Sequence, residues 1–289
     1  MDSAGPQRKG GGMIVRLDLE DTFGDIVRKT ARAKGIPLGQ LAVSAGVDPS
    51  HVERFTKDAA TPTEAEARSL ATALGLDPGK LADIAFGRWR PAENPLPSHI
   101  GHQVNKPHPS NGYFVILEQQ RLAAFVDPGG SVPNIVQTLK RSPVKLDYIL
   151  VTHKHADHID GVPDLRAAFP SARIAVHKLD APALGDLARG ALNVGDGDSL
   201  PFGDGAIRVV HTPGHTDGSI CFIYQGSAFT GDTLFAGSVG GIFGDMTGYD
   251  DLLRTTKLKI FSLPDDTVVL PGHGPPSTIG QEREHNPFF

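Results

Sequence analysis

Cysteine is almost absent from this chain of 289 residues, in which Cys221 is the only thiol. A single thiol excludes an intrachain disulfide framework and fits a reducing compartment. Long hydrophobic runs are missing as well, since no apolar stretch approaches the ~20 residues that a membrane-spanning helix needs. The opening segment, MDSAGPQRKGGGMIV, contains no apolar core of signal-peptide length. We therefore expect a cytoplasmic protein without a membrane partner.

Neither sign of charge is in large excess. The chain has 28 basic and 33 acidic side chains and a formal net charge of -5, so nothing global indicates nucleic acid or an anionic membrane as a partner. A hydrophobic content of 39% and a charged content of 21% are typical of a soluble globular protein. The length allows one large domain or two smaller ones. Residues 1–24, which begin with glycine-rich polar sequence, are expected to form a disordered tail.

Residues 25–87 predict a small all-α domain of short helices. Proline just inside a helix start, after a capping Asp or Thr, and glycine at the helix end are the local signals. Asp48, Thr61 and Asp77 are the expected caps. The five helical segments are 25–35, 37–46, 48–58, 61–75 and 77–87.

This order of helices with short joints resembles the helix-turn-helix domains of the lambda-repressor type. The resemblance implies a recognition helix at about Pro49–Lys57, with outward side chains Ser50, His51, Arg54 and Lys57. DNA affinity requires a basic face, yet the region holds eight basic and eight acidic side chains. Part of such a face could come from Arg28, Lys29, Arg32 and Lys34. DNA binding, with the homodimer that usually accompanies it, stays open beside a packing or dimerisation role.

After residue 87 the sequence pattern changes. Residues 88–98, RWRPAENPLPS, are proline-rich and predict a linker. Beyond it, short apolar runs rich in β-branched and aromatic residues predict strands. These runs are GYFVILE, LAAFVD, LDYILVT, ARIAVH, AIRVVHT, SICFIY, SAFTGD and DTVVLPGH. The helical segments between them are SVPNIVQTLKR, GVPDLRAAF and GYDDLLRTTKLKIF, which makes residues 99–289 an α/β domain.

The segment VTHKHADHIDG, residues 151–161, concentrates three of the 12 histidines and Asp157 within six positions. His153 and His155 are two residues apart, so an extended backbone points both the same way. Asp157 and His158 follow as the chain turns. Imidazole and carboxylate together suit zinc, iron or manganese.

Three further candidates lie where other predicted strands end. His215 follows a Pro-Gly turn, Asp232 follows the run SAFTG, and His273 follows VVLPG. Strands that share a sheet can bring such ends to a common edge. Glycines beside these residues leave room for a metal and a substrate.

The segment 151–161 and the segments with His215, Asp232 and His273 follow one another in an order that resembles the metallo-β-lactamase fold. The resemblance covers residues 99–289 and implies an αβ/βα four-layer sandwich, preceded here by the helical domain. It also implies two divalent metal ions, zinc with iron or manganese as alternatives. The first ion would be held by His153, His155 and His215, the second by Asp157, His158 and His273, and both by Asp232. Asp157 is also the expected catalytic residue, orienting a hydroxide held between the metals.

The segments GDTLFAGSVG and LPGHGPPSTIGQEREHNPFF resemble the glyoxalase II-like branch of that fold. This implies a small-molecule substrate, a hydroxyacyl-glutathione thioester. Two features depart from the branch: GIFGDMTG stands where many relatives carry Arg-Thr-Asp, and the chain stops without the helical domain that grips glutathione. Arg283 is expected to substitute in part. Asp232 argues against antibiotic hydrolysis, because most zinc β-lactamases of this fold lack it.

Several alternatives stay open. One is a mononuclear-iron persulfide dioxygenase, whose family shares the histidine signature. Another is a DNA-binding regulator with a metal-dependent ligand-sensing or hydrolase domain. Lactonase and phosphodiesterase activities are further alternatives for the same metal site. His211 is expected to pack or hydrogen-bond rather than to bind metal, and Cys221 to be a buried apolar residue. For His177, a place at the border of the cleft is a minor alternative.

Overall fold

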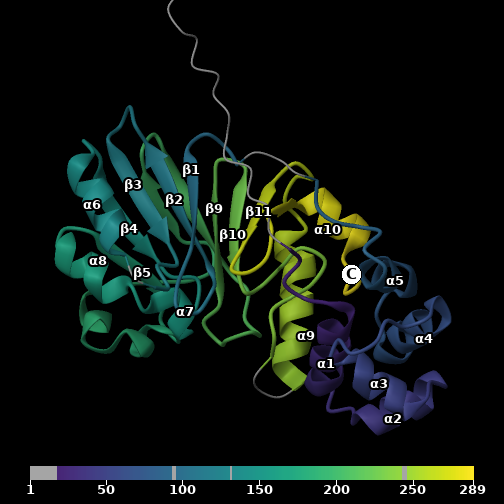
Figure 1. Cartoon of the computed structure of the whole chain (residues 1–289). Helices are drawn as coiled ribbons and strands as arrows, with labels where there is room; N and C mark the ends of the chain where they lie inside the picture. Colours follow the sequence, from purple (N-terminus) through teal and green to yellow (C-terminus); the bar gives the residue numbers. More distant parts are fainter. Residues whose placement is uncertain (1–17, 93–95, 131, 243–245) are drawn as a thin grey trace, which may run out of the picture.

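The computed structural model of the chain describes residues 18–92, 96–130, 132–242 and 246–289 (Figure 1). Most of the predicted tail, residues 1–17, lies outside the described residues. So do residues 93–95 of the predicted linker and residues 243–245 of the GIFGDMTG segment. Among the described residues, no helix combines the length and the hydrophobicity that a bilayer crossing requires.

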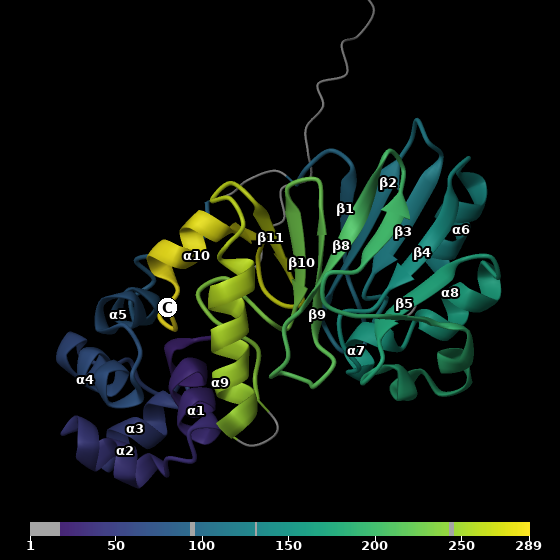
Figure 2. The same cartoon turned by 180° about the vertical axis from the view of Figure 1, so that it is seen from behind.

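Two six-stranded sheets form the centre of the α/β region (Figures 1 and 2). The first has the order β1-β2-β3-β4-β5-β6, with parallel pairing from β3 to β6. Its strands are β1 (Ile100–Val104), β2 (Asn111–Leu117), β3 (Leu122–Val126), β4 (Lys145–Leu150), β5 (Arg173–His177) and β6 (Leu192–Val194). The second has the order β12-β11-β10-β9-β8-β7, in which only the β10–β11 pair is parallel among the described pairings. Its strands are β7 (Ser199–Phe202), β8 (Gly205–His211), β9 (Ile220–Tyr224), β10 (Ser227–Gly231), β11 (Val268–Pro271) and β12 (Ser277–Thr278).

Helices cover the outer faces of both sheets. The first sheet is covered by α6 (Pro133–Arg141) and α8 (Val162–Ala168), with the 3₁₀ segment η1 (Ala181–Gly190) beside them. The second is covered by α9 (Met246–Thr255), its π-helical continuation η2 (Thr256–Ile260) and α10 (Ile279–His285). The short α7 (Ala156–Ile159) lies at the strand ends. The predicted four-layer α/β sandwich is therefore confirmed.

Successive side chains of a strand point to opposite faces of its sheet, and this alternation explains the layering. In β4, Tyr148 and Leu150 pack between the two sheets, whereas Ile149 packs outward under α6 and α8. All eight predicted strand segments are strands in the structure. Sequence analysis missed β1, β6, β7 and β12, which are short or partly exposed at sheet edges.

In the described residues 18–92, five helices precede the sheets. They are α1 (Phe23–Ala33), α2 (Leu38–Ala45), α3 (Pro49–Phe55), α4 (Glu64–Leu74) and α5 (Pro78–Ala85). Asp48 and Asp77 cap α3 and α5 as predicted. The expected cap Thr61 is wrong, because Thr63 forms a capping box with Glu66. Residues 18–24 are not part of a disordered tail, since Thr22 caps α1.

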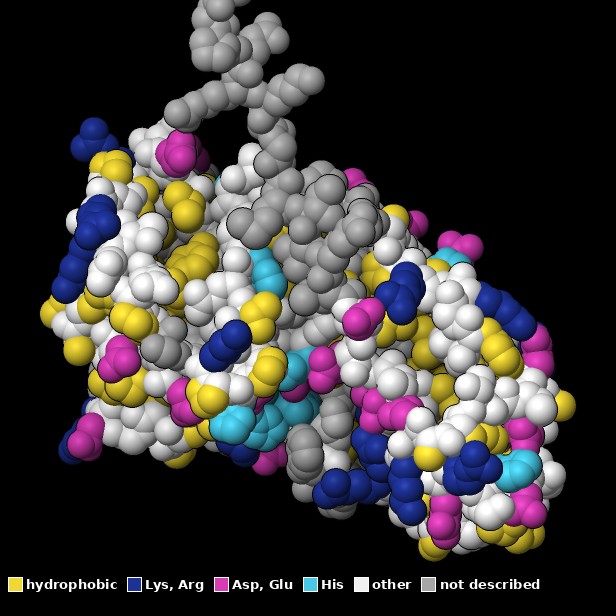
Figure 3. All heavy atoms as spheres, viewed as in Figure 1, with side chains coloured by type: hydrophobic (Ala, Val, Ile, Leu, Met, Phe, Trp, Pro, Cys, Tyr) yellow, Lys and Arg dark blue, Asp and Glu magenta, His cyan; other side chains and the backbone are white. Residues whose placement is uncertain are grey.

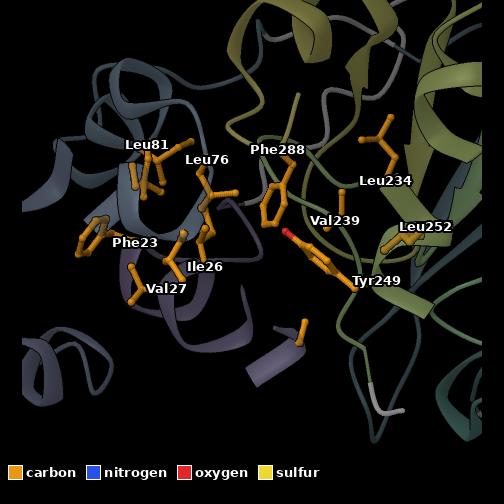
Figure 4. Close-up of a cluster of buried hydrophobic side chains, with 14 of the residues drawn as sticks. Phe23, Ile26, Val27, Leu76, Leu81, Leu234, Val239, Tyr249, Leu252 and Phe288 are labelled. Carbon is orange, nitrogen blue, oxygen red and sulfur yellow. The ribbon is translucent and has the colours of Figure 1, made fainter. Parts of the chain in front are cut away.

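The helices α1–α5 share one hydrophobic core with the second sheet, α9 and α10. Figure 4 shows Ile26 and Leu76 of the helical region on the side facing Phe288 and Tyr249 of the α/β region. Trp89 of the predicted linker is buried and stacks on His285 with 5.1 Å between ring centroids. The predicted boundaries between tail, helical domain, linker and α/β domain stay predictions, but the described part of the linker is packed.

The exposed face of α3 and the turn that follows it carry the side chains predicted to meet DNA. Ser50, His51, Arg54 and Lys57 are all exposed. Two of them have acidic neighbours: His51 Nδ1 lies 2.7 Å from Glu66 Oε1, and Lys57 Nζ lies 3.9 Å from Glu53 Oε2. Acidic neighbours offset the positive charge that phosphate contacts need. The helix-turn-helix resemblance, DNA binding and homodimerisation stay predictions.

Candidate metal centre

The structure brings all seven predicted ligand residues to one edge of the sandwich. His153 and His155 follow β4, and Asp157 and His158 lie on α7. The remaining three follow strands of the second sheet: His215 follows β8, Asp232 follows β10 and His273 follows β11. Within the part of the chain that the structure describes, three groups of potential ligand atoms lie within 4.8 Å of one another. Two of them match the predicted sets, namely His153, His155, His215 and Asp157, His158, His273.

The imidazoles of the first group face one another. His215 Nε2 lies 2.8 Å from His155 Nδ1. The ring of His153 stands nearly perpendicular to that of His215, with 4.7 Å between centroids. Because His215 Nδ1 donates a hydrogen bond to the Gly241 carbonyl at 2.6 Å, its Nε2 is left with the lone pair. This tautomer suits a metal ligand.

The second group is equally compact. His158 Nε2 lies 3.4 Å from both Asp157 Oδ2 and His273 Nε2. His273 Nε2 lies 3.2 Å from Asp157 Oδ2. All three side chains therefore direct one nitrogen or oxygen to the same point.

Asp232 stands between the two groups. Its Oδ2 lies 3.3 Å from His215 Nε2 and 4.0 Å from His153 Nε2 of the first group. Its Oδ1 lies 3.4 Å from His158 Nε2 of the second. One carboxylate thus reaches both groups, as a bridging ligand must.

Unsatisfied buried atoms test whether this donor set fits metal ions. His153 Nε2 and Asp232 Oδ1 are buried and have no hydrogen-bond partner among the described residues. A native fold rarely leaves such atoms unpaired unless an ion or water completes them. Tetrahedral zinc with ligands at about 2.0–2.1 Å requires a separation of about 3.3 Å between ligand atoms. Most of the distances between potential ligand atoms given above are close to that value, so the seven residues fit metal ions of this kind.

The charge states are set by burial and by neighbouring charges. Burial lowers the pKa of His153 well below its usual value, and the neighbouring histidines lower it further, which keeps the imidazole neutral. Burial raises the pKa of Asp232, but the charges of His215 and His158 outweigh it and lower the pKa. For His158, burial opposes protonation, yet Asp232 and Asp127 raise its pKa well above the usual value. Metal binding at His158 Nε2 must therefore displace a proton.

Asp127, at the end of β3, is a residue of the site that sequence analysis missed. Its Oδ2 accepts hydrogen bonds from His158 Nδ1 at 2.9 Å and from Thr152 Oγ1 at 2.6 Å. It therefore fixes the His158 ring with Nε2 toward the other ligands and ties it to the residue before His153. The signal was present in the sequence, because Asp127 ends the predicted strand LAAFVD.

A cleft of about 680 Å³ opens beside the two groups, and five of the seven residues line it. One wall carries His155, Asp157, His215, Asp232 and His273. The rest of the lining comes from α1, with Asp25, Arg28, Lys29 and Arg32, and from the segment before it, with Asp21 and Glu20. Glu20 lies beside the histidines, since its Oε1 is 3.8 Å from His273 Nδ1. Figure 3 shows the histidines beside this hollow and dark blue Lys and Arg side chains across from them. Sequence analysis considered the α1 cations only as part of a DNA-binding face and missed their position in the cleft.

Four other residues considered from the sequence lie away from the cleft wall. His211 Nε2 donates to the Asp217 carbonyl, and its ring stacks on that of His177 with 4.2 Å between centroids. His177 is buried there and does not border the cleft. Cys221 is buried, as predicted. Arg283 pairs with Asp265 and does not line the cleft, so its expected part in substrate binding is wrong.

A buried carboxyl group behind the site should make stability depend on pH. Glu282 Oε2 accepts hydrogen bonds from Gly237 N and Asn286 Nδ2, which holds the loop that follows Asp232. Burial raises the pKa of Glu282 from 4.5 to about 7. Between these values the folded chain keeps a proton that the unfolded chain has released, so rising pH lowers the free energy of unfolding, by on the order of 3 kcal/mol from this group.

We expect Glu282→Gln to remove that loss of stability. The variant should equal the wild type near pH 4.5 and be more stable than it above pH 7, as measured by urea unfolding across this range. Glu284→Gln, at an exposed neighbouring position, is the matched control and should follow the wild-type profile. Parallel profiles for Glu282→Gln and the wild type would contradict the prediction.

Comparisons with known sequences agree with this geometry. Residues 105–273 match the profile of the Metallo-beta-lactamase superfamily. Hydroxyacylglutathione hydrolase GloC of Haemophilus influenzae is 30% identical over 192 residues, which cover 61% of this chain and 91% of that protein. The hydroxyacylglutathione hydrolase of Tolumonas auensis is 35% identical over 170 residues, covering 58% of this chain and 63% of that protein.

Solved structures of similar proteins have the same fold. BLEG-1, a B3 metallo-beta-lactamase, superimposes with a TM-score of 0.56 and 33% identity, covering 65% of this chain and 98% of that one. ETHE1 from Myxococcus xanthus has a TM-score of 0.58 and 27% identity, covering 65% and 83%. Because the superfamily profile spans more than half of the chain and the fold agrees with it, the chain belongs to the metallo-beta-lactamase superfamily.

Proposed function

We propose that this chain is a dinuclear-metal hydrolase that cleaves thioesters of the hydroxyacyl-glutathione type. The observation that carries the proposal is the convergence of seven side chains in two groups, with Asp232 between them. The hydroxyacylglutathione hydrolases among its relatives support the thioester class. The cleft volume lies in the range typical of small-molecule sites, which supports a substrate of that size.

The seven residues would divide between two divalent ions. One ion would be held by His153, His155 and His215, the other by Asp157, His158 and His273, and Asp232 would contact both. Bound ions of this kind lower the pKa of water and polarise the carbonyl that is attacked. Imidazole and carboxylate donors suit zinc, with iron and manganese as alternatives.

The chain's own groups would position the reaction. Asp127 and the Gly241 carbonyl hold the His158 and His215 rings in the orientation that binding requires. Burial raises the pKa of Asp157, but His158 and His273 lower it far more, so its carboxylate is ionised. Because that carboxylate lines the cleft, it would accept a hydrogen bond from the attacking water and orient it.

Substrate turnover by metal-reconstituted protein tests the proposal. Two metal ions per chain by elemental analysis, together with hydrolysis of lactoylglutathione, are the expected results. A lactone, a phosphodiester and a β-lactam should be tested alongside, the last because BLEG-1 is similar. Preferred turnover of any of these three over the thioester would contradict the assigned substrate class.

The persulfide dioxygenase alternative differs in its metal and its co-substrate. It would give one iron per chain and oxygen uptake with glutathione persulfide. Because that family shares the histidine signature, the convergence of Asp157, His158 and His273 is compatible with both functions, and the metal count and the co-substrate decide between them.

A further inference from the structure

One face of α1 is turned toward the cleft. The cleft-lining residues of this helix are Asp25, Arg28, Lys29 and Arg32, which are spaced i, i+3, i+4 and i+7. The residues between them, including Ile26, Val27 and Thr30, are buried in the shared core. Since residues at this spacing form one stripe on a helix, α1 presents a polar stripe of three cations and one acid to the cleft.

Lys29 anchors this wall. Its ammonium group pairs with Asp21 and donates to the Val239 carbonyl. It also lies over the rings of Phe235 and Phe288, at 5.6 and 5.9 Å from their centroids. The side chain is only 17% exposed, so its charge is committed to holding α1 against the loop that follows Asp232.

Arg28 differs from Lys29, because its side chain is 55% exposed. Its Nη1 donates to the Thr56 carbonyl at 2.8 Å, and its Nη2 pairs with Asp25 Oδ1. The other oxygen of Asp25 is engaged by Thr22 at the start of the helix. Asp25 therefore orients the guanidinium. Among the described residues Arg28 makes these two hydrogen bonds, and its five N–H groups leave capacity for a carboxylate.

Arg32 follows Arg28 by one helical turn and is exposed. Two like charges at this spacing cost a few tenths of a kcal/mol of helix stability. Guanidinium groups bind carboxylates in a bidentate manner.

We propose that Arg28 and Arg32 form a subsite for a carboxylate of the substrate's thiol carrier, across the cleft from the bond that is cleaved. The inference rests on the proposed function, because it assumes that the acyl carbonyl lies at the seven ligand residues. A glutathione-type thioester carries carboxylates remote from its acyl group, so one end can contact α1 while the other reaches the metal centre. The helical region thereby contributes to substrate selection.

Binding of S-methylglutathione to the metal-loaded full chain, measured by calorimetry, tests this subsite without turnover. We expect Arg28→Gln combined with Arg32→Gln to raise the Kd at least tenfold. The dimethyl ester of the same ligand, which lacks the carboxylate charges, should bind the wild type and the double variant alike. Arg189→Gln is the matched control, because Arg189 also pairs with an acid three residues before it and lies outside the cleft. Its Kd should stay at the wild-type value.

Kinetics with lactoylglutathione give the second readout. The double variant should show a KM raised about tenfold with kcat within a factor of two, and Arg32→Gln alone, which keeps the Arg28 contacts, should show a smaller rise. An unchanged Kd and KM in the double variant, or equal losses for the ligand and its dimethyl ester, would overturn the subsite and leave the proposed function standing. Arginine-dependent binding of S-methylglutathione without hydrolysis of any thioester would overturn the proposed function and leave the subsite standing.

Discussion

Asp232→Ala is expected to remove at least one metal ion per chain and to reduce thioester turnover to background. Asp232 is 9% exposed and lies within 4.0 Å of ligand nitrogens from both groups. If Asp232 bridges as proposed, neither group would keep a full set of donors without its carboxylate, and the positive charges of two bound ions would face each other unshielded. Loss of a residue that only supports a ligand costs about 10–100-fold in affinity or activity, so loss of a shared ligand should cost more.

Metal content by elemental analysis and the rate of lactoylglutathione hydrolysis measure this effect. Asp186→Ala is the control, since Asp186 is 92% exposed and outside the cleft. It should retain the wild-type metal content and rate. A full complement of metal in Asp232→Ala, bound as tightly as in the wild type, would show that this residue does not bridge.

Gly129→Ala is expected to disrupt the second ligand group and to destabilise the fold. A Cβ at residue 129 would lie 1.3 Å from the Asp157 carbonyl oxygen and 2.8 Å from the His158 backbone nitrogen. Backbone cannot rotate away as a flexible side chain can, so α7 must shift. Forced overpacking costs about 1–3 kcal/mol or more, and a displacement of about 1 Å at a catalytic group costs on the order of 100-fold in rate.

Thermal unfolding, metal content and turnover measure the three consequences separately. Gly195→Ala is the control, because a Cβ there meets nothing within 4 Å among the described residues. We expect it to behave as the wild type does. A Gly129→Ala variant with wild-type metal content and rate would show that α7 accommodates the methyl group without moving Asp157 or His158.

The convergence of the seven predicted ligand residues could be foreseen because each is marked locally. His153, His155, Asp157 and His158 are adjacent in the sequence, and the other three follow strands whose apolar runs are clear. Strand ends at one edge of a sandwich must come together, so local pattern was enough. The same reasoning applied to the β3 end would have included Asp127, whose role in holding His158 depends on a contact across the sheet.

The position of α1 was not predictable in this way. Its apolar and polar stripes are visible in the sequence, but nothing in them indicates which part of a second region the polar stripe will face. Docking depends on Lys29 meeting Val239 and on Leu76 and Tyr249 sharing one core, contacts between residues far apart in the chain. The cap of α4 was ambiguous in the sequence, because Thr61 with Glu64 and Thr63 with Glu66 have the same capping-box spacing, and the structure uses the second pair.

The packing of α1 has a mechanical consequence for catalysis. Many enzymes close a loop over the substrate, and the motion of that loop limits the rate or the selectivity. Here the wall opposite the histidines belongs to a regular helix whose underside is immobilised among Ile26, Val27 and their partners. Binding groups on such an element are preorganised, so a ligand loses little free energy in ordering them. Substrates should therefore be selected at this wall by a rigid, preformed surface and not by a loop that closes over them.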